Sequence, residues 1–174
     1  MGNITGVKPL QKWCRNLKNK LQAMRVKNDP LHPAYHFTPP VNWMGNPNGL
    51  IQWKGQTHLF FQYNPAEPIR SNIHWGHAVS NDLVNWKRLP LALAPTPQDP
   101  DRDGCFSGRC FIHEGLPHLM YTGGLPETQC LAYGSDDFQI WQKNNNNPMI
   151  PKPPSDWISS AFMIHEYGKK MATG

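Results

Sequence analysis

The chain has 174 residues, of which 39% are hydrophobic, and its 18 prolines and 14 glycines suit short strands joined by tight turns. The net charge of +5 is uneven, because residues 1–28 contain seven basic residues and no acidic one, which leaves −2 for residues 29–174. A nucleic-acid groove needs basic residues interleaved through the folded part, so we expect no nucleic-acid partner. No run of 18 apolar residues and no apolar N-terminal signal region occurs, so we expect no membrane span and a cytoplasmic location.

The first element predicted in chain order is a helix over residues 9–27. Apolar residues recur there at spacings of three and four, which places them on one stripe of a helix. The stripe consists of Leu10, Trp13, Leu17, Leu21 and Met24. We expect the stripe to pack against the rest of the protein; the alternative is a helix on a membrane surface. Residues 1–28 are therefore predicted to be a basic amphipathic leader helix.

After Asp29-Pro30 the pattern changes to strands and turns, and two internal repeats appear. The pattern S-x-D-apolar-x-x-W occurs at residues 80–86 and again at 135–141, 55 residues later. A hairpin with a turn glycine occurs three times, at Gly55, Gly115 and Gly168.

A repeat of this length built from hairpins is typical of four-stranded β-propeller blades. We expect an all-β fold in which residues 29–174 are the N-terminal part of a propeller, with about two blades and the start of a third. Since so few blades do not close a propeller, we expect a C-terminal part of the same propeller as a partner. Asp82 and Asp136, which lie in the repeats, are predicted to stabilise turns.

The cysteines and histidines show no metal-ligand spacing. The four cysteines are Cys14, Cys105, Cys110 and Cys130, and no C-x-x-C pair occurs. We expect them to be reduced thiols. His74 and His77 lie close together in sequence, but no third ligand accompanies them. We therefore expect neither a metal nor a cofactor.

The densest group of unusual residues is the segment 36–50. Pro47 fixes one backbone angle and Asn48-Gly49 is a strong turn signal, so this segment is predicted to be a rigid entry into the first strand. The first strand of a propeller blade lines the central axis, where ligands bind. Trp43 and Asn46 would then lie near that axis.

Four segments resemble glycoside hydrolase family 32, the invertases and sucrose-6-phosphate hydrolases. Residues 43–49 resemble the family's W-M-N-D-P-N-G signature, residues 58–65 its H-L-F-Y-Q-Y-N-P, residues 74–80 its H-W-G-H-A-x-S, and residues 103–108 its D-G-C-F-S-G. The resemblance implies a five-bladed propeller and a retaining mechanism in which one carboxylate attacks the fructosyl carbon and another protonates the leaving oxygen. Its substrates would be sucrose, sucrose 6-phosphate or another fructosyl sugar. The implied sugar-binding residues are Trp43, Met44, Gly45, Asn46, Gln62, Trp75, Phe106 and Ser107.

The sequence departs from the family pattern at the positions of the catalytic residues. Asn46 stands at the position of the nucleophilic Asp, and Gly45 at the position of the preceding Asn. The family's R-D-P acid aligns with residues 159–161, which contain neither Arg nor Asp, and its E-C general acid would align after Gly174. Arg109 follows Gly108 where the family has Ser, which places a cation near the predicted pocket.

Three interpretations remain open from the sequence. The first is an enzyme of the fructosidase family. The second is a sugar-binding pseudoenzyme that keeps the aromatic residues and has lost the acids. The third is a non-functional, truncated gene product. Because a neutral amide is a very poor nucleophile, we expect the chain as written not to hydrolyse its sugar.

Overall fold

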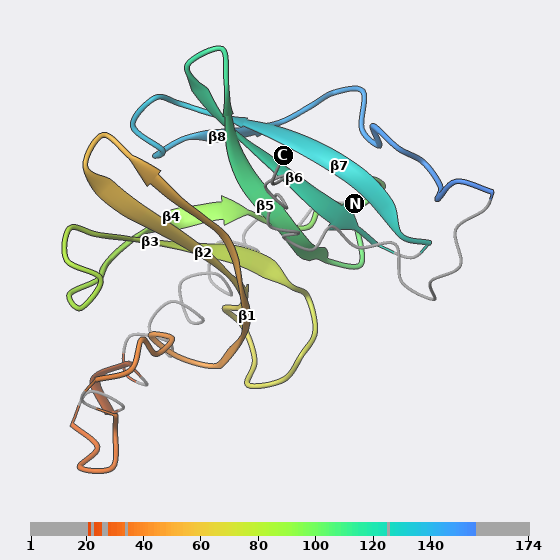
Figure 1. The fold of residues 1–174 in the computed structure, drawn as a ribbon. Helices are drawn as coiled ribbons and strands as arrows, with labels where there is room; N and C mark the ends of the chain where they lie inside the picture. Colours follow the sequence, from red (N-terminus) through yellow and green to blue (C-terminus); the bar gives the residue numbers. More distant parts are fainter. Residues whose placement is uncertain (1–20, 22, 26–27, 34, 125, 156–174) are drawn as a thin grey trace, which may run out of the picture.

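The computed structural model describes residues 21, 23–25, 28–33, 35–124 and 126–155 (Figure 1). These residues form eight strands in two four-stranded antiparallel sheets. The first sheet contains β1 (Trp43–Trp53), β2 (Gln56–Asn64), β3 (His74–Ser80) and β4 (Lys87–Leu93). The second sheet contains β5 (Cys105–His113), β6 (Leu116–Gly123), β7 (Thr128–Gly134) and β8 (Trp141–Lys143).

In each sheet the strands pair in the order in which they follow one another in the chain. The first strands of the two sheets, β1 and β5, lie next to each other, and the two sheets spread away from this contact (Figure 1). At the contact, a Cβ atom on Gly49 would lie only 3.0 Å from the backbone nitrogen of Cys110. This is the arrangement of two consecutive propeller blades, and it confirms the all-β prediction made from the repeat.

The two predicted hairpin turns have the same backbone conformation. Lys54 and Gly55 connect β1 to β2 with φ angles of 48° and 80°, and Glu114 and Gly115 connect β5 to β6 with φ angles of 51° and 77°. Two successive residues with positive φ define a two-residue turn whose twist matches that of the paired strands. The glycines at 55 and 115 therefore occupy equivalent positions in the two blades.

The S-x-D repeat forms the loop between the last two strands of each blade. In the first blade the Asp82 carboxylate accepts hydrogen bonds from the backbone N–H groups of Val84 and Asn85, at 2.9 and 2.7 Å. A further hydrogen bond from the Asn85 side chain, together with those two, lowers the pKa of Asp82. The prediction that Asp82 stabilises a turn is confirmed.

In the second blade the turn residue is Asp137, not Asp136. The Asp137 carboxylate accepts a hydrogen bond from the Ser135 hydroxyl at 2.6 Å and another from the Gln139 N–H at 3.2 Å. Asp136 instead forms an ion pair with Lys54 of the first blade. The prediction for Asp136 was wrong because the Asp of the S-x-D pattern at residues 135–141 is Asp137, whereas Asp136 has an ion-pair partner 82 residues away in sequence.

One apolar cluster joins the two sheets. Phe60, Trp75 and Leu93 come from the first sheet, and Leu119 and Tyr121 come from the second. All five side chains are at most 3% exposed. Full burial of such a side chain contributes about 1.5–3 kcal/mol, so this cluster stabilises the two blades as one unit.

Most of the predicted leader helix, residues 9–27, lies outside the described residues. Residues 21 and 23–25 are helical, with Leu21 54% exposed and Met24 64% exposed. These two stripe positions therefore do not pack on the sheets. Within the described part of the chain, no helix has the length and apolarity needed to cross a membrane. The predicted start of a third blade, with Gly168, also lies outside the described residues.

The three cysteines in the described part of the chain, Cys105, Cys110 and Cys130, are buried free thiols, as predicted. Burial raises the pKa of the Cys110 thiol to about 12, so it stays protonated and unreactive at neutral pH. Cys14 lies outside the described residues.

Candidate functional site

The eight predicted site residues lie at one end of the two blades, because the strands that hold them are in register there. Trp43 pairs with Asn64, and Gln62 pairs with Trp75, which places the start of β1, the end of β2 and the start of β3 together. The start of β5 joins this end through a hydrogen bond from the Cys105 N–H to the Ile73 carbonyl, at 2.8 Å.

Each inner strand carries a β-bulge at this end. In β1 the pairing passes from Met44 opposite Tyr63 to Pro47 opposite Phe61, so two β1 residues, Gly45 and Asn46, lie opposite Gln62 alone. A bulge bends a strand and redirects its side chains, which is common beside functional sites.

The second bulge is in β5. There the pairing passes from Cys105 opposite Gly123 to Gly108 opposite Tyr121, so Phe106 and Ser107 lie opposite Thr122 alone. Four of the eight predicted site residues are therefore bulge residues. The sequence analysis did not predict these bulges, although a glycine at position 45 or 108 inside a strand is a signal for one.

A side-chain hydrogen bond connects the two blades inside the site. The Gln62 amide Nε2 donates to the Ser107 hydroxyl oxygen at 3.2 Å, and the two residues are only 3% and 7% exposed. Because the Ser107 oxygen accepts this hydrogen bond, the hydroxyl proton is left to donate elsewhere.

Trp75 forms a hydrogen bond with the backbone of the second bulge. Its side chain is fully buried, and the indole Nε1 donates to the Phe106 carbonyl oxygen at 2.9 Å. The Arg70 guanidinium lies over the Phe106 ring, 6.0 Å from its centroid. Trp75 has no exposed surface, so its contribution here is to hold the Phe106 backbone in place.

The other residues of β1 divide between the site and the core. Met44 packs against a small apolar cluster that contains Phe61 and Tyr63. Trp43 is half-buried and folds back over Gly45, and Asn46 is exposed. None of the eight predicted site residues carries a carboxylate.

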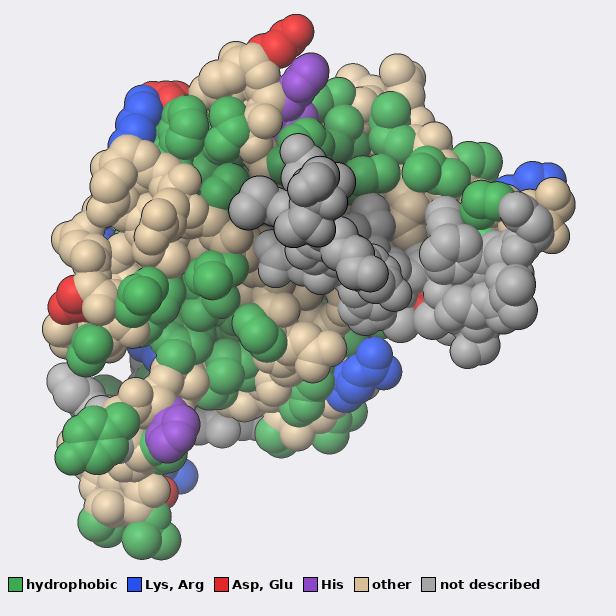
Figure 2. Space-filling model, in the orientation of Figure 1, with side chains coloured by type: hydrophobic (Ala, Val, Ile, Leu, Met, Phe, Trp, Pro, Cys, Tyr) green, Lys and Arg blue, Asp and Glu red, His purple; other side chains and the backbone are tan. Residues whose placement is uncertain are grey.

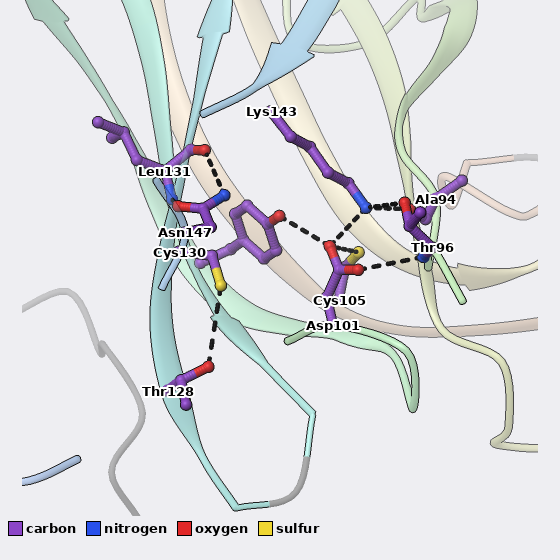
Figure 3. Close-up of polar contacts among 10 residues, drawn as sticks. Ala94, Thr96, Asp101, Cys105, Thr128, Cys130, Leu131, Lys143 and Asn147 are labelled. Carbon is purple, nitrogen blue, oxygen red and sulfur yellow. Dashed lines mark hydrogen bonds and ion pairs between the residues drawn. The ribbon is translucent and has the colours of Figure 1, made fainter. Parts of the chain in front are cut away.

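A buried charged network holds the segment that leads into β5 (Figure 3). The Asp101 carboxylate, 1% exposed, pairs with the Lys143 ammonium at 2.5 Å and accepts hydrogen bonds from the Tyr121 hydroxyl at 2.8 Å and the Thr96 N–H at 3.1 Å. Burial, and then the neighbouring Cys105 side chain and Asp101 carboxylate, raise the pKa of Tyr121 well above its usual value, so its hydroxyl remains a donor.

The Asp101 backbone also takes part, since its carbonyl accepts from the Gly104 N–H at 2.9 Å, immediately before Cys105. The network therefore fixes the chain just ahead of the Phe106–Ser107 bulge. Sequence reasoning missed Asp101 and Lys143 because they lie 42 residues apart and no local pattern joins them.

The fold and the candidate site define a class: part of a β-propeller, one end of which is lined by aromatic, amide and hydroxyl side chains. The family model described as glycosyl hydrolases family 32 N-terminal domain matches residues 36–162. The chain therefore belongs to glycoside hydrolase family 32, as its resemblance predicted.

The proteins to which this chain is similar are longer than it is. Sucrose-6-phosphate hydrolase from Zymomonas mobilis is 44% identical over 144 residues, which cover 77% of this chain and 28% of that protein. Raffinose invertase from Escherichia coli is 41% identical over 132 residues, which cover 70% of this chain and 27% of that protein. The chain thus spans less than a third of the length of these two relatives.

Solved structures show the same relationship. The structure of fructan 1-exohydrolase IIa from Cichorium intybus matches with a TM-score of 0.63 and 42% identity, over 68% of this chain and 24% of that chain. Sucrose-6-phosphate hydrolase from Lactobacillus gasseri matches with a TM-score of 0.71 and 28% identity, over 79% of this chain and 29% of that chain. These matches identify the two sheets as blades of a family 32 propeller. Residues 159–161, the predicted position of the R-D-P acid, lie outside the described residues.

Proposed function

We propose that this chain binds the fructosyl unit of sucrose, sucrose 6-phosphate or another fructosyl sugar without hydrolysing it. The observation that carries the proposal is the position of Asn46. It is exposed on the β1 bulge opposite Gln62, where the family resemblance places a nucleophilic aspartate. The names of the relatives, which include a sucrose-6-phosphate hydrolase and a raffinose invertase, support fructosyl sugars as the ligand class.

In this proposal each site residue has a separate role in sugar binding. The Trp43 ring contacts the apolar face of the sugar, since aromatic faces are the usual partners of such surfaces. The Ser107 hydroxyl, which already accepts from Gln62, donates to a sugar oxygen. Trp75 holds the Phe106 backbone through its indole N–H and thereby keeps Ser107 in position.

The loss of hydrolysis follows from the chemistry of an amide. A retaining glycosidase forms a covalent bond between its carboxylate and the sugar, and a second carboxylic acid protonates the leaving oxygen. Asn46 carries no negative charge and cannot form that bond at a useful rate. Hydrolysis remains the alternative function, favoured by the family membership alone.

The test is an assay of glucose released from sucrose by three proteins: the chain, its Asn46→Asp variant, and a complete family 32 enzyme as positive control. We expect the chain to release glucose no faster than a heat-inactivated sample. We expect Asn46→Asp alone not to restore turnover, because a nucleophile that acts without protonation of the leaving oxygen loses about 10²–10⁴-fold in rate. Clear turnover by the unmodified chain would contradict the proposal. A folded chain that binds no sucrose in a binding measurement would favour the non-functional interpretation.

Further propeller strands are the partner we propose for the second sheet. Large hydrophobic side chains stay exposed on or beside it, among them Leu116 at 46%, Tyr133 at 40% and Ile150 at 39%. Figure 2 shows hydrophobic side chains gathered in several groups over one face of the molecule. The exposed apolar side chains of the second sheet are the kind of surface that another part of a protein covers. The cytoplasmic location predicted from the sequence remains a prediction.

A further inference from the structure

The Trp43 ring lies directly over Gly45, and only glycine leaves room for it. A Cβ atom at position 45 would lie 2.3 Å from Cη2 and 2.8 Å from Cζ2 of Trp43. Contacts shorter than 3.0 Å are essentially never made by real Cβ atoms, so any side chain at position 45 displaces the ring. Gly45 is not among the glycines with positive φ, so the reason for glycine here is space and not backbone conformation.

The same position adjoins the polar contact between the blades. The Cβ atom that Gly45 lacks would lie 3.2 Å from Oε1 of Gln62, whose Nε2 donates to Ser107. The Trp43 ring, the Gln62 amide and the Ser107 hydroxyl therefore lie around one small region of the β1 bulge. These three groups are neutral, and Asn46, the next bulge residue, is neutral as well.

We propose that Gly45 is a specificity-determining residue: it seats the Trp43 indole over the bulge, so that the site accepts the apolar face of a neutral sugar ring. The inference rests on the proposed sugar-binding function. A residue with a side chain at position 45, such as the Asn of the family signature, would compete with the ring for the same space. Relative to the family signature, Gly45 and Asn46 replace an amide side chain and a carboxylate, which leaves the Trp43 ring and a neutral amide at the bulge.

The experiment uses the 174-residue chain, labelled with ¹⁵N at its tryptophan indoles, and sucrose as the probe. The variants are Gly45→Ala and Gly45→Asn, and Trp43→Phe assigns the Trp43 indole resonance. The matched control is Gly55→Asn, because a Cβ atom at Gly55 has nothing within 4 Å and that turn is at the opposite end of β1.

We expect both Gly45 variants to shift the Trp43 indole resonance and to raise the Kd for sucrose about threefold to tenfold, the size of one lost aromatic contact. Gly55→Asn should change neither. If a Gly45 variant does not fold, as judged by the dispersion of its amide resonances, Trp43→Phe provides the second test. It adds no volume at position 45 and should weaken sucrose binding by a similar factor.

The outcomes separate this inference from the function on which it rests. Unchanged sucrose affinity in folded Gly45→Ala, or in Trp43→Phe, would overturn the inference while the chain still binds sugar. Failure of the unmodified chain to bind sucrose would overturn the proposed function and this inference together. An equal loss of affinity in Gly45→Ala and Gly45→Asn would support displacement of the ring, because alanine adds only the Cβ atom.

Discussion

At the scale of the residue, His77 is a buried histidine in which only one of the two ring nitrogens has a hydrogen-bond partner in the described part of the chain. Its Nε2 atom lies 3.0 Å from Nδ1 of His58, while its Nδ1 has no hydrogen-bond partner in the described part of the chain. Its ring also stacks on Phe60, with centroids 4.3 Å apart. Desolvation, and then the neighbouring His58, lower the pKa of His77 to about 3. Proton uptake by this ring is therefore coupled to unfolding.

We expect acid to destabilise the protein through His77. Its pKa is lower in the folded protein than the ordinary value of 6.5, so the unfolded chain binds the proton first. The free energy of unfolding should be unaffected by this group above about pH 6.5 and should fall by up to about 1.4 kcal/mol per pH unit between pH 6.5 and 3. Urea unfolding across this range measures the slope.

The variant that tests this is His77→Gln, which should unfold along a shallower pH profile than the unmodified chain. His113→Gln is the control, because the His113 side chain is 65% exposed and the substitution removes no buried ring. An identical slope in His77→Gln would assign the acid sensitivity to other groups.

At the scale of the element, the Asp101–Lys143 pair connects the last strand of the second blade to the segment that precedes β5. Lys143 lies at the end of β8, and its ammonium also donates to the Ala94 carbonyl at 2.6 Å and the Thr96 hydroxyl at 2.7 Å (Figure 3). The segment between β4 and β5 connects the two blades. The Lys143 ammonium contacts Ala94 and Thr96 near the start of this segment and Asp101 near its end.

Lys143→Met should destabilise the protein by about 3 kcal/mol. The substitution leaves the Asp101 carboxylate buried and without its cation, and an uncompensated buried charge is strongly destabilising. Chemical denaturation gives the size of the effect. Lys54→Met is the matched control, since the Lys54–Asp136 pair is exposed at 60% and 54% and should cost at most about 1 kcal/mol. Equal losses of stability from the two substitutions would show that the Asp101 network stabilises the fold no more than an exposed ion pair does.

At the scale of the whole molecule, Phe138 connects the two blades. It lies in the loop between β7 and β8, yet its ring stacks on His58 of the first blade, with centroids 4.0 Å apart. It also contacts Trp53 and Trp141, one from each blade, and is fully buried. A blade that lost this contact would lose part of the core that both blades share.

We expect Phe138→Ala to lower the free energy of unfolding by about 3–5 kcal/mol, the usual cost of removing a buried phenylalanine ring. We also expect hydrogen exchange to show that the amides of β2 and of β6 lose protection together, because one apolar cluster spans both sheets. Ile140→Ala is the control, since Ile140 is 71% exposed. Loss of protection in the second sheet alone would show that the blades unfold separately.

The sequence by itself determined the local features of this protein. The 55-residue repeat predicted the two blades, and Gly55 and Gly115 predicted their hairpin turns, because turn conformation depends on neighbouring residues. The identity of Asn46 is likewise a property of the sequence, and it carries the expectation that the chain does not hydrolyse its sugar. The one error in the repeats, the role given to Asp136, concerned a residue whose partner lies in the other blade.

Only the tertiary structure decided how the site is built. Nothing in the sequence pattern indicated that Gln62 donates to Ser107 across the two blades, that Trp75 is buried beneath Phe106, or that the Trp43 ring occupies the space above Gly45. These contacts join residues from different strands and depend on bulges that shift the pairing by one residue. Gly45 and Gly108 are sequence signals for a bulge, but the side chains that each bulge brings together are known only when the strands are paired.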